Sequence, residues 1–245
     1  MADRFPPPKL RIALLVYGIL WWVLMPVILI YLWKRGRKDP LYSQHIAERF
    51  GRYPDPRPDA VWVHAVSLGE MRSATPLIRA LLDRGEHVVT THFTPAGRRE
   101  AEREFAREIA EGSVRTVWVP LDYGFAYRRF LARFAPKYGL VMEIEIWPRM
   151  IMACRAAGVP LFMCNAQYPL KSYNKDKDGL RAGLLAGFAG GFVKSQAQKD
   201  RFAAAGMSNI HITGELRFDQ PIPQAHLDAA AQFRADLTKG RRTFT

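Results

Sequence analysis

Short apolar runs rich in β-branched residues alternate with longer stretches of helical periodicity over most of the chain, and this alternation constrains its fold more than any other feature. The expected strands are residues 61–66, 87–93, 116–119, 140–146, 161–165, 191–194 and 210–213. The expected helices between them are residues 71–83, 97–108, 125–134, 150–157 and 196–205. This order is typical of β-α-β units. It predicts an α/β fold with a Rossmann-like parallel sheet and flanking helices.

An uncharged and mainly apolar stretch from Ile12 to Trp33 precedes this pattern. It is long enough for a helix to cross a hydrocarbon layer of about 30 Å, and Pro26 is tolerable inside such a helix. The basic segment 34–38 (KRGRK) follows it at once, and the positive-inside rule assigns such a segment to the cytoplasmic side. We therefore expect one N-terminal membrane helix, with the remainder of the chain on the cytoplasmic side.

Two other interpretations of this stretch stay open. One is a cleaved signal peptide, although no small-x-small cleavage site follows the stretch and the basic segment lies on the wrong flank. The other is a helix lying obliquely in one leaflet, because Arg4, Lys9 and Arg11 place positive charge on the N-terminal flank as well.

The formal net charge of +13 favours an anionic partner. Nucleic acid is the usual interpretation of such a charge, but the sequence has no zinc-finger spacing, no RRM-like aromatic motif and no dense basic tract in its body. We therefore expect membrane phospholipids or a phosphorylated substrate as partners, and no nucleic acid. Cys154 and Cys164 are spaced neither for zinc nor for a disulfide framework, so they are expected to be reduced core thiols.

The turns that follow the strands are the places to look for chemistry, because ligands of open α/β sheets bind beyond the carboxyl ends of the strands. No GxGxxG and no GxxxxGK[ST] is present. The first turn reads SLGE, in which Gly69 permits a tight turn and Glu70 stands where a helix begins. A carboxylate there either caps the helix or acts as a general base presented to a hydroxyl substrate.

Two acids, Glu143 and Glu145, end the fourth expected strand in the segment MEIEIWP. Side chains alternate along a strand, so both are expected on one face. Parallel strands are normally buried on both faces, and two carboxylates there are costly unless they pair with cations or bind a ligand. This favours a site at the strand end, with Arg72, Arg149 and Arg217 as candidate cationic partners.

Three further features carry weaker expectations. Thr94 and Gly97 open a helix after the second strand, where the backbone amides either bind an anion or belong to an ordinary capped helix. His64 and His92 lie on apolar strands and are expected to be core histidines. Residues 171–177 suggest a mobile loop or an exposed linker. No cluster has metal-ligand spacing, so no metal is expected.

Seven segments carry a resemblance, in the order WKRGRKDPLYSQHIAERFGRYP, HAVSLGE, THFTPAG, VPLDYG, MEIEIWPR, CNAQY and TGELRFD. In this order and spacing they resemble the 3-deoxy-D-manno-octulosonic acid (Kdo) transferase family. The resemblance implies an inverting, two-domain glycosyltransferase of the GT-B type at the cytoplasmic side of the bacterial inner membrane. Such an enzyme transfers Kdo from CMP-Kdo to a lipid A precursor, lipid IVA, in lipopolysaccharide core biosynthesis. It implies that this chain is the N-terminal, acceptor-binding half, with no cofactor of its own.

The resemblance also implies roles for individual residues. Glu70 corresponds to the general base, Glu143 to a stabiliser of the transition state, and Arg217 to a second stabiliser that is usually Lys in the family. Contacts to the acceptor are expected from Ser67, Gly69, Thr94, Gly97 and Glu145.

The sequence departs from the family pattern in three places. Residues 165–169 read NAQYP where the family reads N-A-R-L-S, and Glu215 replaces a small or amide residue. The chain stops at Thr245, which corresponds to about the first strand of a C-terminal CMP-Kdo-binding domain. A non-catalytic, membrane-tethered lipid-binding or scaffold protein of the same family is therefore the alternative function.

Four segments follow from these inferences. They are a membrane anchor with its basic flank (1–38), a juxtamembrane segment and linker (39–58), the Rossmann-like acceptor-binding domain (59–225) and a connector towards the missing domain (226–245).

Overall fold

A computed structural model describes residues 5–176, 179–220, 222 and 224–238. Its centre is a seven-stranded parallel sheet with the order β3-β2-β1-β4-β5-β6-β7. The strands are β1 Val61–His64, β2 Val88–His92, β3 Val114–Trp118, β4 Tyr138–Met142, β5 Leu161–Ala166, β6 Gly190–Val193 and β7 Ile210–Ile212. All seven expected strands are present, which confirms the predicted fold class.

The helices that follow the strands agree with the expected periodicity except at a few points. They are α3 Leu68–Asp83, α4 Pro95–Glu104, α5 Ala106–Ala110, α6 Gly124–Phe134, α7 Pro148–Ala157, α8 Leu170–Asp176, α9 Leu180–Leu185 and α10 Gln196–Ala204. The expected helix 97–108 is broken at Phe105. The loop expected at 171–177 is wrong, because α8 occupies it up to Asp176, and Lys177 lies outside the described residues.

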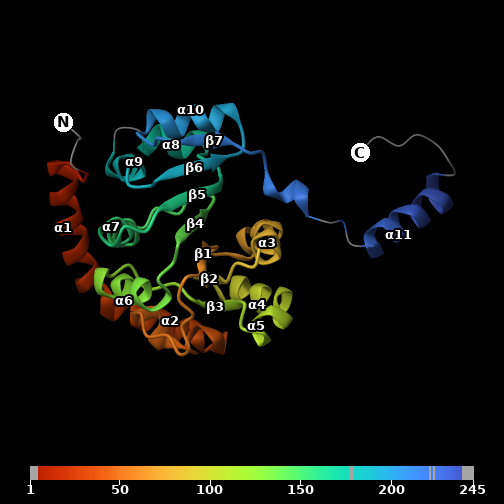
Figure 1. The fold of residues 1–245 in the computed structure, drawn as a ribbon, viewed down its shortest axis with the longest axis horizontal. Helices are drawn as coiled ribbons and strands as arrows, with labels where there is room; N and C mark the ends of the chain where they lie inside the picture. Colours follow the sequence, from red (N-terminus) through yellow and green to blue (C-terminus); the bar gives the residue numbers. More distant parts are fainter. Residues whose placement is uncertain (1–4, 177–178, 221, 223, 239–245) are drawn as a thin grey trace.

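The helices cover the sheet in two layers (Figure 1). One apolar core joins α3 and α4 to β1, β2 and β3, and a larger one joins α6, α7, α9 and α10 to the opposite face. On the α3 side of the sheet, Phe162, Phe192 and Leu216 line a cleft of about 430 Å³ together with residues of α3. The core therefore fixes the strands firmly and leaves their carboxyl ends free for side chains with chemistry.

The N-terminal segment is not the single helix that the sequence predicts. It forms α1 Pro8–Val23 and α2 Met25–Gly36, which meet at an angle of 52°. No single described helix is long and apolar enough to cross a membrane, although the bent pair passes the same test together. Pro26 explains the break, because it has no N–H to donate to Trp22 and its ring crowds that carbonyl group.

The first part of the juxtamembrane segment, residues 40–50, is packed against the domain. It contains the short 3-10 helices η1 Pro40–Tyr42 and η2 Ile46–Phe50. Glu48 Oε2 accepts hydrogen bonds of 2.7 Å from Arg98 Nη1 and from the backbone N of Trp118. The two charged side chains are only 5% and 6% exposed. This buried ion pair joins η2 to α4 and to β3.

The expected connector begins with another helix. Residues after β7 form η3 Leu216–Asp219, then α11 Gln224–Phe233 and a π-helical turn, Arg234–Thr238. α11 has no buried residue and extends away from the body (Figure 1). Residues 239–245 lie outside the described residues.

We predict that Arg98→Met lowers the free energy of unfolding by about 3 kcal/mol, because it leaves the Glu48 carboxylate buried without its cation. Arg99→Met is the matched control, since Arg99 Nη1 pairs with Asp39 Oδ2 at 2.8 Å on the surface. Loss of an exposed pair costs at most about 1 kcal/mol. Urea unfolding measures both values, and equal losses for the two variants would contradict this account.

Candidate active site

The strand order places two candidate segments beside each other. The chain runs outward from β1 through β2 to β3 and outward in the other direction from β4 to β7, so its direction switches between β1 and β4. A ligand crevice is expected beyond the carboxyl ends of the strands at such a switch point. Glu70 follows β1, whereas Glu143 and Glu145 follow β4. The topology therefore brings together the three acids that the sequence singled out.

Glu70 occupies the third position of α3 and takes part in a reciprocal helix cap. Its backbone N donates to Ser67 Oγ at 3.3 Å, and its Oε2 accepts from the backbone N of Val66 at 2.6 Å. This is a capping-box-like arrangement. The capping interpretation is thus correct, but it occupies one carboxylate oxygen. Oε1 makes no hydrogen bond within the described part of the chain.

The environment of Glu70 favours its protonated form. Burial, together with the negative charges of Glu145 and Glu143, raises the pKa of this carboxyl to about 7, and the hydrogen bond from Val66 opposes the shift. The residue is only 9% exposed. A carboxyl with a pKa near neutrality exchanges protons readily at physiological pH, as a general base must.

Glu143 does not lie on a strand, so the expected alternation with Glu145 is wrong. β4 ends at Met142, and Glu143 adopts a left-handed backbone with φ 56° while its N donates to Cys164 O at 2.9 Å. Asn165 at the end of neighbouring β5 is also left-handed, with φ 52°. Residues in this conformation are costly unless surrounding contacts impose it, and they concentrate at functional sites.

Glu145 accepts a hydrogen bond from an aromatic side chain, and the positive charge of Arg181 also acts on it. Its Oε2 accepts a 2.6 Å hydrogen bond from Trp147 Nε1. The indole of Trp147 lies edge-on to His64 and Phe93, each with ring centroids 5.8 Å apart. Burial raises the pKa of Glu145, and the hydrogen bond from Trp147 acts against the shift. Glu145 is the neighbouring charge with the largest effect on the pKa of Glu70. Its carboxylate is therefore fixed among aromatic side chains.

The three expected cationic partners are engaged elsewhere. Arg72 Nε pairs with Glu100 Oε1 at 2.9 Å, and Arg149 Nη2 donates to Leu14 O at 2.7 Å. Arg217, on η3, is 65% exposed in its side chain and pairs with Glu215 at 3.7 Å. The prediction that these arginines pair with Glu143 or Glu145 is therefore wrong for the described residues. None of these arginines neutralises Glu143 or Glu145. Repulsion from these two carboxylates therefore adds to the effect of burial, and both raise the pKa of Glu70.

Thr94 and Gly97 support the turn that presents Glu70. Thr94 Oγ1 donates to Val66 O at 3.0 Å and accepts from the backbone N of Gly97 at 3.3 Å. A Cβ at Gly97 would lie 3.1 Å from the backbone of Ser67. These contacts favour a bracing role for the α4 N-terminus over anion binding. Gly69 differs, because its φ is not left-handed and a Cβ there would meet nothing within 4 Å.

The buried histidines and cysteines are core residues, and His64 packs against Trp147. Burial lowers the pKa of both His64 and His92 to about 3, and hydroxyl groups of Thr91 and Thr90 hydrogen-bond their rings. Cys154 and Cys164 are free and buried. The expectation of core residues is confirmed for all of them. No group of three or more His, Cys, Asp or Glu within the described ranges is arranged to hold a metal ion.

Asp122 is a residue that the sequence interpretation missed. It follows β3 at the same sheet edge and is 1% exposed. Its carboxylate accepts from Tyr17 Oη at 2.7 Å and from the backbone N of Arg149 and Met150, each at 3.1 Å. Burial raises its pKa to about 6, and these hydrogen bonds oppose the shift. The sequence does hold a signal for this residue: Asp122 is a single acid between apolar Leu121 and aromatic Tyr123, shortly after an expected strand.

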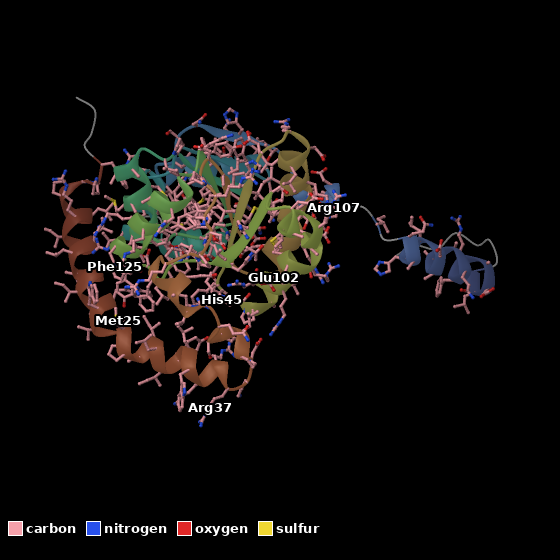
Figure 2. The ribbon with its side chains drawn as sticks, turned by 60° about the horizontal axis from the view of Figure 1, so that its bottom comes forward. Met25, Arg37, His45, Glu102, Arg107 and Phe125 are labelled. Atoms are coloured by element: carbon pink, nitrogen blue, oxygen red, sulfur yellow. The ribbon has the colours of Figure 1, made fainter. Side chains whose placement is uncertain are left out.

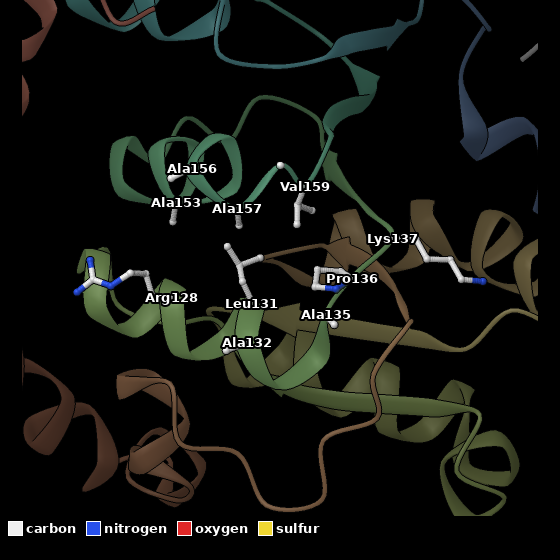
Figure 3. A pocket seen from close by; sticks show the side chains of 11 residues that line it. Arg128, Leu131, Ala132, Ala135, Pro136, Lys137, Ala153, Ala156, Ala157 and Val159 are labelled. Atoms are coloured by element: carbon white, nitrogen blue, oxygen red, sulfur yellow. The ribbon is translucent and has the colours of Figure 1, made fainter.

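A wide cleft lies away from these residues. It measures about 610 Å³ and opens between α6 and α7, with alanines and Leu131 facing one another and with Arg128 and Lys137 at its two ends (Figure 3). Lys137 precedes β4 and Val159 precedes β5, so this cleft is at the amino edge of the sheet. Its lining holds no acid and no nucleophile, and the carboxyl edge remains the candidate site.

Comparison with known proteins supplies the family context. Residues 44–220 match the family described as "3-Deoxy-D-manno-octulosonic-acid transferase (kdotransferase)". The 3-deoxy-D-manno-octulosonic acid transferase of Bordetella pertussis is 41% identical over 220 residues, covering 86% of this chain and 51% of the relative. The transferase of the same description from Haemophilus influenzae is 31% identical over 83% of this chain and 48% of the relative. The chain thus spans about half the length of these relatives.

Among solved structures, the crystal structure of Glycyrrhiza uralensis UGT73P12 complexed with glycyrrhetinic acid 3-O-monoglucuronide has a TM-score of 0.45 and 13% identity. The match covers 65% of this chain and 49% of that chain. The similarity is too low to support a conclusion about function.

We predict that Glu70→Gln stabilises the fold at about pH 8 by about 1–3 kcal/mol and has a smaller effect at about pH 5. The pKa of Glu70 is raised to about 7 in the folded chain, so its contribution to stability is present at low pH and is lost as the pH rises through that value. Glutamine keeps an oxygen that accepts from Val66 and carries no charge.

Thermal unfolding at both pH values measures this difference. Glu111→Gln, at an exposed position, is the control and should change neither midpoint. A destabilised Glu70→Gln at about pH 8 would show that the carboxylate is not desolvated in the folded state.

Proposed function

The chain belongs to the 3-deoxy-D-manno-octulosonic-acid transferase family, and we propose that it supplies the acceptor-binding half of an inverting glycosyltransferase. In this proposal the donor is CMP-Kdo and the acceptor is a lipid A precursor, lipid IVA, in lipopolysaccharide biosynthesis. The CMP-Kdo site belongs to a second, C-terminal half of the GT-B enzyme. No cofactor or metal takes part in this half.

The observation that carries the proposal is the desolvated carboxylate of Glu70 at the carboxyl edge of the sheet, next to the negative charges of Glu145 and Glu143. Its Oε2 is fixed by Val66, which leaves Oε1 to accept a proton from the acceptor hydroxyl. As the hydroxyl oxygen forms a bond to the anomeric carbon of Kdo, the bond from that carbon to the phosphate oxygen breaks and CMP leaves. The proton passes to Glu70, and attack from the opposite side inverts the anomeric centre. Holding base and hydroxyl together supplies much of the rate enhancement.

Two other side chains are assigned to the transition state by the family resemblance. Glu143 lies at the end of β4 in a backbone conformation that fixes its direction. Arg217 lies on η3, which Asn165 Oδ1 ties to the same edge by accepting from Leu216 N at 3.1 Å. Arg217 is exposed, and its pairing with Glu215 is a weak surface contact at 3.7 Å. It is therefore available to turn towards developing negative charge when the donor half is present.

Acceptor contacts are assigned to the residues around Glu70. They are Ser67, Gly69 and Glu145, together with Thr94 and Gly97, which act by holding the turn. We also propose that the chain lies at the cytoplasmic face of the bacterial inner membrane, with phospholipids as partners. The lipid acceptor of the proposal and the apolar N-terminus support this localisation. The unpaired cations on the surface of the chain contribute to the formal net charge of +13, which favours anionic headgroups.

Catalysis is tested by joining the chain to the C-terminal half of the Bordetella pertussis relative and measuring CMP release from CMP-Kdo in the presence of lipid IVA. We expect Glu70→Gln to reduce the rate by about a hundredfold or more, because proton transfer loses its base. Lipid IVA binding should be unchanged, since glutamine has the same shape. Glu111→Gln serves as the control.

Two results would contradict the enzymatic proposal. An unchanged rate for Glu70→Gln would remove the proposed base. Lipid IVA binding without CMP release, in a fusion that binds CMP-Kdo, would instead support a membrane-tethered lipid-binding or scaffold protein.

We further predict that Gly69→Ala lowers the rate of the fusion at least about tenfold without lowering the melting temperature. The added methyl group meets no atom of this chain, and alanine is the better helix former, so the fold should tolerate it. The methyl group would occupy the space beside Glu70 that the acceptor needs. Gly183→Ala in α9 is the control, since its Cβ would lie 4.0 Å from Leu10 and away from Glu70. Equal rates for both variants would show that this space is not used by the acceptor.

A further inference from the structure

Helix α1 carries two apolar stripes that face in opposite directions. Leu10 and Leu14 are buried in the main core together with residues of α7 and α9. The side facing away from the domain is lined by the exposed residues Ile12, Leu15, Val16, Ile19, Leu20 and Val23. Both sets follow the spacing of three and four residues that defines one face of a helix. The domain therefore covers one side of α1 along its length and leaves the other side bare.

The covered side is held by polar contacts as well as by apolar packing. Tyr17 Oη donates to Asp122, and Tyr123 Oη donates to the carbonyl oxygen of Trp21 at 2.9 Å. Arg149 lies so close to α1 that a Cβ at Gly18 would be 2.0 Å from its Nη2 atom. Only glycine permits this approach. These contacts fix α1 against the carboxyl edge of the sheet.

Helix α2 continues the same arrangement. Leu32 is buried, and Met25 packs beside Phe125 of α6 (Figure 2). The guanidinium of Arg35 lies 5.3 Å from the ring centroid of Tyr42 on η1. On the outer side, Val27, Ile30, Tyr31 and Trp33 are exposed. The pair forms a bent frame along one side of the domain, and its outer surface is mainly apolar.

This packing is incompatible with a pair that crosses a bilayer. A spanning segment is surrounded by lipid or by other membrane-embedded protein over about 30 Å. Here α1 is covered by a domain that brings the charged Asp122 and Arg149 against its middle. If α1 crossed the bilayer, the side chains of Asp122 and Arg149 would lie in the hydrocarbon region, and burying charged groups there costs free energy. The same contacts cause no such cost when the helix lies at the membrane surface.

The charges at the ends of the pair point to the same arrangement. Lys9 and Arg11 lie at the start of α1, whereas Lys34, Arg35 and Arg37 lie at the end of α2. A spanning pair would leave one of these basic groups on the far side of the membrane. A pair that lies flat brings both groups to the anionic headgroups of one leaflet, where each cation contributes favourably.

We propose that α1 and α2 lie together in the plane of one leaflet of an anionic phospholipid membrane, immersed by their outer apolar surface, and do not cross it. The proposal rests on the membrane attachment proposed above but not on sugar transfer. Helices that lie in the membrane interface insert about 5–10 Å, to the boundary of headgroups and acyl chains. The exposed Trp22, Tyr31 and Trp33 suit that depth, because indole and phenol groups favour the interface.

Labelling from each side of the membrane tests this topology in the chain expressed in a Gram-negative host. Lys9→Cys reports on the start of α1 and Ser208→Cys on the exposed body; the parent, whose two cysteines are buried, gives the background. In intact spheroplasts, a membrane-impermeant maleimide should label neither variant. In inverted inner-membrane vesicles it should label both.

A second measurement concerns the outer surface. Val16→Asp with Ile19→Asp should reduce flotation of the purified chain with phosphatidylethanolamine–phosphatidylglycerol vesicles by about tenfold or more, since both residues face outward. The melting temperature should not change. Leu14→Asp, on the covered side, should lower the melting temperature instead.

Three outcomes overturn the proposal. Labelling of Lys9→Cys in intact spheroplasts shows a spanning N-terminus. A parent chain that neither sediments with membranes nor floats with vesicles removes membrane attachment altogether. A dimer in solution that the Val16→Asp, Ile19→Asp variant dissociates, without any effect on flotation, assigns the outer surface to a second copy of the chain. Failure of CMP release from the fusion bears on catalysis and leaves the topology standing.

Discussion

The candidate site depends on the hydrogen bonds that the buried carboxylate of Asp122 accepts. Asp122 follows β3 and accepts hydrogen bonds from two backbone amides at the start of α7 and from Tyr17 of α1. Because α7 begins at Pro148, these bonds also fix the preceding segment, in which Trp147 holds Glu145. Glu145 in turn is the neighbouring charge that acts most strongly on Glu70. One buried acid therefore couples the apolar N-terminal helix to the electrostatics of the proposed base.

The site is built at a cost in stability. Glu70 and Glu145 are buried near one another, and no cation pairs with either within the described residues. Local hydrogen bonds offset part of this cost: Val66 and Ser67 hold the Glu70 turn, and Thr94 holds Val66. The rigid turn holds the Glu70 carboxylate in place, and burial keeps it largely out of contact with water. A general base requires both a fixed position and a raised pKa.

Sequence reasoning succeeded where one physical signal dominated. Apolar runs and helical periodicity predicted the parallel sheet, and the rule for open α/β sheets directed attention to the turns that follow the strands. That Glu70 meets the acids after β4 became clear only from the strand order. Sequence reasoning failed where tertiary contacts decide the backbone. The left-handed conformation of Glu143, the burial of Glu48 with Arg98, and the role of Asp122 depend on partners far along the chain. Pro26 was a readable signal for the break between α1 and α2, but a continuous span was expected because proline is tolerated in membrane helices.

The central claim is that Glu70 is a desolvated carboxylate that titrates near neutrality at the carboxyl edge of the sheet. A pH titration of the glutamate side-chain carboxyl carbons by ¹³C NMR, with Glu70→Gln to assign the resonance, measures this property directly. The account predicts a resonance with a midpoint near the pKa of about 7, absent from the variant. A Glu70 resonance that titrates at or below the ordinary glutamate value of about 4.3 would contradict it.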